Sequence, residues 1–103
     1  MELQIEEFDS KIREIIPEKA TLEQIATGFG FTEGPIWGGD YLLFSDIPRN
    51  RIIRLQMHTY GPEITTFRNP SGNSNGLTLD RSGRLIACEH STRRVTRTEV
   101  DGS

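Results

Sequence analysis

The chain has 103 residues, with 15 acidic and 12 basic side chains and a formal net charge of −3. Residues 1–40 carry nine acids and three bases, whereas residues 41–103 carry six acids and nine bases. This modest and uneven charge lacks the clustered basic face of a nucleic-acid-binding domain. Leu, Ile, Val and Phe make up about a quarter of the chain, a share that favours a folded protein over a disordered one.

The N-terminus, MELQIEEFDSK, has neither a basic region nor an apolar run, so it predicts no signal peptide. No stretch approaches the ~20 apolar residues that a membrane-spanning helix needs. We therefore expect a soluble, cytoplasmic protein without membrane or nucleic-acid partners. The single cysteine, Cys88, cannot form an intrachain disulfide, and we expect it to be a small buried strand residue.

The first predicted element is a short helix over residues 8–16, which Pro17 ends. It rests on an apolar stripe at i, i+4, i+7 and i+8: Phe8, Ile12, Ile15 and Ile16. The alternation in residues 19–28 predicts a strand. We assign residues 1–21 to an N-terminal helix and lead-in, and residues 22–103 to the main domain.

After the lead-in, apolar residues recur with a period of two and turn-forming residues are frequent. Six segments have strand length: YLLFSD (41–46), RIIRLQ (51–56), EITTFR (63–68), NGLTLD (75–80), RLIACEH (84–90) and RRVTRTEV (93–100). The last of these is expected to be a solvated outer strand. No helical segments separate the strands, so an all-β fold is predicted.

The strand-rich part repeats itself. Glu33 aligns with Asn75 at an offset of 42, and after one inserted residue Asp46 aligns with Glu89 at an offset of 43. A repeat of about 40–50 residues with three or four short strands is typical of a β-propeller blade. An isolated β-sandwich is an alternative, but it leaves the repeat unexplained.

Propellers close with roughly four to eight blades, whereas this sequence holds about two. We therefore expect residues 22–103 to be an incomplete propeller, the N-terminal part of a longer protein that continues beyond residue 103. The site of such a protein would be only partly supplied by these residues.

Two polar residues stand at the start of the predicted inner strands, which line the channel of a propeller. Because Glu33 and Asn75 are equivalent in successive repeats, we expect them to face each other across the mouth of the channel. Carboxylate and amide oxygens suit Ca²⁺ or Mg²⁺, and Zn²⁺ also accepts carboxylate. Structural alternatives are a turn carboxylate for Glu33 and a turn-forming Asn-Gly dipeptide for Asn75.

Four blocks in order, FTEGPIW, YLLFSDIPRNRIIRL, SGNSNGLTLDRSGRL and CEHSTRRVTR, closely resemble the SMP-30/gluconolactonase/LRE-like family. The resemblance runs from about Leu22 to the last residue. It implies a six-bladed β-propeller with one divalent metal ion in the channel, Ca²⁺ first and Zn²⁺ or Mg²⁺ as alternatives. It also implies hydrolysis of a sugar lactone, such as glucono-1,5-lactone, by metal-activated water.

The resemblance also implies roles for single residues. Glu33 looks like the first metal ligand, and Asn75 looks like the channel asparagine that contacts substrate or metal-bound water. Asn73 lies where animal members place a substrate-binding arginine, which is absent here. His90 is a further candidate substrate contact, although a histidine after a strand is more often structural. The other ligands, an asparagine and the general-base aspartate, are expected beyond residue 103.

Two functional alternatives remain open at this point: a non-catalytic propeller that binds calcium or a carbohydrate, and a related esterase or organophosphate hydrolase. The oligomeric state is also open. The remaining predictions are structural: acid–arginine pairs within each blade for Asp46 and Glu89, a place in the core between blades for Trp37, and a surface loop for His58.

Overall fold

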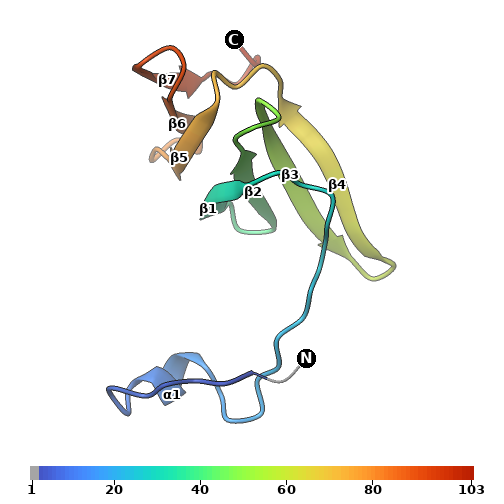
Figure 1. Cartoon of the computed structure of the whole chain (residues 1–103), viewed down its shortest axis with the longest axis vertical. Coiled ribbons are helices and arrows are strands. Elements are labelled where there is room, and N and C mark those ends of the chain that lie inside the picture. Colours follow the sequence, from blue (N-terminus) through green and yellow to red (C-terminus); the bar gives the residue numbers. More distant parts are fainter. Residues whose placement is uncertain (1–2) are drawn as a thin grey trace.

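The structure, a computed structural model, describes residues 3–103 and consists of one short helix and two antiparallel sheets. The helix α1 spans Ile12–Ile15. The first sheet has the strand order β1 (Thr32–Trp37), β2 (Tyr41–Asp46), β3 (Arg51–His58) and β4 (Gly61–Arg68). The second has the order β5 (Ser74–Leu79), β6 (Leu85–Glu89) and β7 (Arg94–Thr98). Figure 1 shows the two sheets next to each other and α1 apart from them, joined by an extended segment.

The two sheets share one register. Thr32 of β1 pairs with Asp46 of β2, and Ser74 of β5 pairs with Glu89 of β6. Each first strand then has a register shift before regular pairing resumes. These matches reproduce the predicted offset of 42 between the first strands and 43 between the second. Two successive meanders of this kind, with β1 and β5 in contact, are blades of a β-propeller, which confirms the predicted fold.

Successive side chains of a strand point to opposite faces of a sheet, and β2 and β3 of the first sheet bury side chains on both faces, whereas β4 is mostly exposed. Leu43 and Ile52 lie between the two sheets, where they pack with the buried Leu85 of the second sheet. Phe44 points to the other face and meets Phe29, which precedes β1, edge-on, with ring centroids 5.1 Å apart. The segment before β1, residues 22–31, thus packs on this face of the sheet through its side chains.

Two predicted elements in the N-terminal part differ from the structure. Residues 19–28 form no strand. The segment packs its side chains on a sheet face, and its backbone does not pair with the edge of a strand. The helix is confined to residues 12–15. Phe8 and Ile15 are 89% and 78% exposed, and an apolar stripe without a packing partner supports little helix on its own.

Three single-residue predictions were wrong. Cys88 is exposed, because the alternation along β6 turns Ala87 into the core and Cys88 to the opposite face. Trp37 is 59% exposed and does not join the core between the blades, where its neighbour Ile36 packs. His58 ends strand β3 and stacks on an aromatic ring there. No helix within the described residues has the length and apolar character needed to cross a membrane.

Candidate functional site

The inner strands of the two blades touch at Gly34 and Asn75. A β-carbon built on Gly34 would overlap the carbonyl oxygen of Asn75, and Gly34 has a φ of 65°. Glycine alone combines that backbone conformation with so close an approach. The sequence predicts that Glu33 and Asn75 face each other across the mouth of the channel. The structure brings Gly34, which follows Glu33, against the backbone of Asn75, and the facing of the two side chains stays a prediction.

A pair of buried serines supports this contact. Ser45 and Ser74 are fully buried, and their Oγ atoms lie 3.0 Å apart. Ser45 Oγ also donates a hydrogen bond of 3.0 Å to the carbonyl oxygen of Asn75. Ser45 is the ladder partner of Glu33, so the hydroxyl pair joins the start of β1 to the start of β5.

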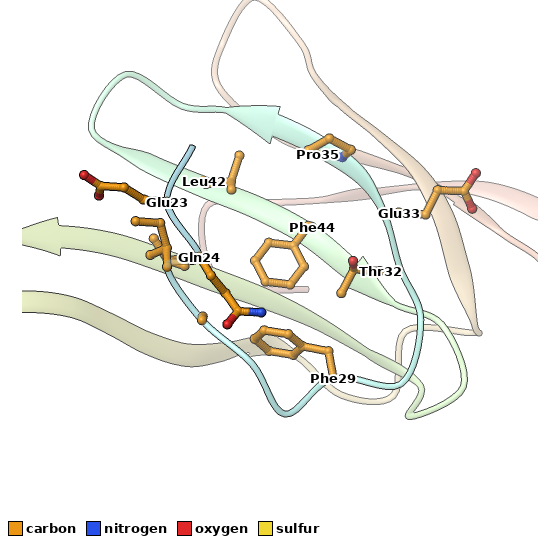
Figure 2. Close-up of a pocket in the computed structure, with 11 residues that line it drawn as sticks. Glu23, Gln24, Phe29, Thr32, Glu33, Pro35, Leu42 and Phe44 are labelled. Carbon is orange, nitrogen blue, oxygen red and sulfur yellow. The ribbon is translucent and has the colours of Figure 1, made fainter. Parts of the chain in front are cut away.

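The side chains of Glu33 and Asn75 differ in how they are engaged. Asn75 lies in strand β5 and not in a turn, and its Oδ1 accepts a hydrogen bond of 2.7 Å from the backbone N–H of Gly76. The side-chain NH₂ of Asn75 makes no hydrogen bond within residues 3–103. Glu33 is exposed, and its carboxylate takes part in no hydrogen bond or ion pair of the described residues. Figure 2 shows this carboxylate pointing away from the rings of Phe29 and Phe44.

Asn73 and His90 lie at the same end of the second blade. Asn73 has a φ of 52°, and its Nδ2 donates a hydrogen bond of 2.8 Å to the carbonyl oxygen of Ile47. His90 is exposed in the turn after β6, and its backbone N–H donates to the carbonyl oxygen of Asn73 at 3.4 Å. Their proposed contact with substrate stays a prediction.

A buried carboxylate lies beneath the start of β1. Asp46 Oδ1 accepts backbone N–H groups of Gly30 at 3.0 Å and Phe31 at 3.2 Å. Its Oδ2 accepts a hydrogen bond of 3.0 Å from Nε of Arg51 and forms an ion pair with Nη2 of the same residue at 2.9 Å. Burial alone raises the pKa of Asp46, but the hydrogen bonds from Arg51 and the two backbone groups outweigh it and lower the pKa below its ordinary value. The predicted pairing of Asp46 with Arg51 is confirmed.

Glu89 takes the equivalent place in the second blade with more partners. Its carboxylate accepts hydroxyl hydrogen bonds from Thr96 at 2.6 Å and Thr92 at 2.7 Å. It also pairs with Arg94 at 3.3 Å, as predicted, and with Arg68 at 3.0 Å. Sequence reasoning missed Arg68, which ends β4 of the preceding blade, so this ion pair joins the two blades.

Burial alone raises the pKa of Glu89, but the hydrogen bonds from Thr96, Thr92 and Arg94 and the charge of Arg68 lower it to about 2, from an ordinary 4.5. The unfolded chain therefore takes up the proton first as the pH falls. The stabilisation is complete above pH 4.5 and is lost as the pH falls toward 2.

The midpoint temperature of thermal unfolding, measured between pH 7 and 2, should therefore decrease once the pH is below 4.5. A Glu89→Gln variant should show a shallower fall, and parallel curves for the two proteins would contradict this role.

A shallow apolar pocket lies where the segment before β1, residues 22–31, crosses the first sheet (Figure 2). Phe29, Leu42 and Phe44 line it, with Glu23 and Glu33 also on its border. Asn73, Asn75 and His90 are not among its lining residues, so the pocket and the start of β5 are separate features. Within residues 3–103, no three histidine, cysteine or carboxylate side chains gather to hold a metal ion.

Comparison with known proteins places this arrangement in a family. The model of the SMP-30/gluconolactonase/LRE-like region matches residues 31–103. The chain belongs to this family. The sequence-based recognition is therefore confirmed, and the match includes Glu33, Asn73, Asn75 and His90.

Proteins described as gluconolactonases are similar to the chain in sequence and in structure. A gluconolactonase of Zymomonas mobilis is 28% identical, over 92% of the chain and 30% of the relative. The crystal structure of a candidate gluconolactonase is 31% identical, with a TM-score of 0.75 over 93% of the chain and 33% of its own length. A gluconolactonase from Xanthomonas campestris is 30% identical, with a TM-score of 0.61 over 73% of the chain and 25% of its own length. The chain thus spans a third or less of these relatives.

Proposed function

We propose that the protein containing this chain hydrolyses a sugar lactone of the glucono-1,5-lactone type in the channel of its propeller. The observation that carries the proposal is the contact between the starts of β1 and β5 in a chain of this family. It puts a free carboxylate, Glu33, and an amide, Asn75, on neighbouring inner strands. The relatives that match in sequence and in structure are named as gluconolactonases, which points to the same class of substrate.

Glu33 suits the part of a metal ligand. Its carboxylate is exposed and makes no hydrogen bond or ion pair with the other described residues, so both oxygens are available. The preferred cation is Ca²⁺, with Mg²⁺ and Zn²⁺ as alternatives, because a carboxylate is a hard oxygen ligand. When bound, such a cation would polarise the lactone carbonyl and make a water molecule more acidic. Further ligands and the general-base aspartate are expected outside residues 1–103.

Asn75 suits the part of a hydrogen-bond donor to substrate. Its side-chain oxygen is already engaged by the N–H of Gly76, so the group that it can offer is the NH₂. An NH₂ directed at a lactone oxygen orients the substrate and stabilises negative charge that develops on that oxygen. Asn73 and His90 border the same end of β5 and are proposed as further substrate contacts.

The test is the replacement Glu33→Gln in the full-length protein. We expect the affinity for Ca²⁺ and the kcat/KM for glucono-1,5-lactone to fall by about 100-fold or more, because even indirect partners of metal ligands typically contribute about 10–100-fold. Titration calorimetry measures the first and pH-stat hydrolysis the second. A chelator should likewise abolish the wild-type activity.

The matched control is Glu23→Gln. Glu23 is an exposed carboxylate on the border of the same apolar pocket, and it lies in the segment before β1, ahead of the inner strand. It should keep both metal affinity and activity. Activity that survives both the chelator and Glu33→Gln would reject the metal-dependent mechanism. Calcium binding without turnover of lactone would indicate the non-catalytic alternative.

A further inference from the structure

One side chain of the first blade holds the loop that leads into the second. Asn50 is the last residue of the turn between β2 and β3 and has a φ of 57°. Its Oδ1 accepts three hydrogen bonds from the loop before β5: from the N–H of Asn73 at 2.9 Å, and from the N–H and Oγ of Ser71 at 3.1 and 3.4 Å. A single acceptor thus gathers donors from two residues of a loop more than 20 positions away.

The contact between turn and loop is reciprocal. Asn73 donates its own side-chain NH₂ to the carbonyl oxygen of Ile47, the first residue of the same turn. The N–H of Ser71 also has the carbonyl oxygen of Asn50 as a second acceptor, at 3.0 Å. The N–H of Asn73 has no second acceptor of this kind among the described residues, so its hydrogen bond depends on Asn50 Oδ1.

The loop that Asn50 holds continues directly into the candidate site. Ser71 is fully buried, and its Oγ accepts the N–H of Ser74 at 3.4 Å. Ser74 begins β5 and belongs to the hydroxyl pair described above, and Asn75 follows it. The orientation of the proposed substrate contacts, Asn73 and Asn75, is therefore fixed from one side by Asn50.

We propose that Asn50 is a positioning residue for substrate binding, a role that rests on the proposed function. It acts through Asn73 and Asn75, because its own acceptor oxygen is already occupied by the loop. The sequence alone gave Asn50 no role beyond a turn. The left-handed backbone at this position also allows two informative replacements, because glycine and aspartate both tolerate it.

Two variants of the full-length protein distinguish the contribution of the acceptor oxygen from that of the backbone conformation. Asn50→Gly keeps a favourable backbone at the turn and removes the acceptor, whereas Asn50→Asp keeps an acceptor in the same place. We expect Asn50→Gly to raise KM for glucono-1,5-lactone by about 10-fold, since misplacing a group by about 1 Å can cost about 100-fold. Asn50→Asp should stay close to the wild type.

The structural control is Ile53→Val, which removes one buried methyl group from the first blade without touching the turn or the loop. KM does not depend on the fraction of molecules that are folded. A variant that is merely less stable therefore lowers the apparent kcat and leaves KM unchanged, which is the result expected for Ile53→Val.

A second measurement does not need activity. In NMR spectra of the full-length protein, the backbone N–H of Asn73 should exchange about 10-fold faster in Asn50→Gly, as expected for one lost hydrogen bond. The side-chain NH₂ signals of Asn73 and Asn75 should shift in the same variant. Both should be unchanged in Asn50→Asp and in Ile53→Val.

The outcomes distinguish the two proposals. Faster exchange together with a raised KM supports the role of Asn50. Unchanged exchange and unchanged side-chain signals in Asn50→Gly overturn it, whatever the activity. Faster exchange with an unchanged KM, in an active enzyme, also overturns it. A wild-type protein that does not hydrolyse lactones rejects the proposed function, and the side-chain NH₂ signals then decide whether Asn50 fixes the two asparagines.

Discussion

Replacing Gly34 by alanine is expected to destabilise the protein by about 2–5 kcal/mol and, on the proposed function, to weaken the binding of metal and lactone. A left-handed backbone costs an L-residue about 1–2 kcal/mol, and an overfilled contact adds about 1–3 kcal/mol. The new methyl group would meet the carbonyl oxygen of Asn75, a backbone atom that cannot rotate away. The two inner strands must therefore separate at the point where Glu33 and Asn75 stand.

Gly83→Ala is the control for this variant. Gly83 also has a positive φ, 79°, but a β-carbon there meets nothing within 4 Å. The loss of unfolding free energy in Gly83→Ala, measured by urea denaturation, reports only the cost of a left-handed backbone at an alanine. The excess loss in Gly34→Ala then measures the contact between the blades, and equal losses in the two variants would contradict that contact.

Glu89→Gln is expected to lower the free energy of unfolding by about 3–5 kcal/mol at pH 7, the usual range when one partner of a buried ion pair is removed. The variant keeps the shape of the side chain but leaves Arg68 and Arg94 facing a neutral amide. Because Arg68 belongs to β4, the substitution should destabilise the junction between the blades as well as the second blade.

The matched control is Glu99→Gln. Glu99 also pairs with two arginines, Arg84 and Arg97, but its side chain is 37% exposed. Ion pairs that water can reach contribute little to stability, so the control should unfold close to the wild type. Urea denaturation at pH 7 compares the two variants, and a loss in Glu89→Gln no larger than that in Glu99→Gln would reject the assignment.

Much of the fold follows from patterns that lie close together in the sequence. The period of two and the turn residues predicted β2 to β7, and the repeat predicted that two blades share one register. The pairing of Asp46 with Arg51 was also predictable, because both residues flank the same turn and the spacing recurs in the next blade. Such features depend on short segments, whose physical preferences can be read directly from the residues.

The errors and omissions concern contacts between segments that are far apart in the chain. Residues 19–28 alternate like a strand, yet they lie across a sheet face. This arrangement depends on the face to which the side chain of Phe44 points. Cys88 looked like a core residue by type, but the strand turns it outward. Neither Arg68 nor Asn50 has a local signature for its role, since each acts on a residue about 20 positions away.

The ion pair between Glu89 and Arg68 has a consequence for any attempt to recombine these blades. Asp46 keeps all its partners within its own repeat and the two residues just before β1, whereas Glu89 takes one cation from the strand that closes the repeat before it. Transplanting the second blade into another propeller would leave the buried carboxylate of Glu89 without Arg68. A workable chimaera would therefore carry Arg68 along as part of the exchanged module, with the cut placed upstream of β4.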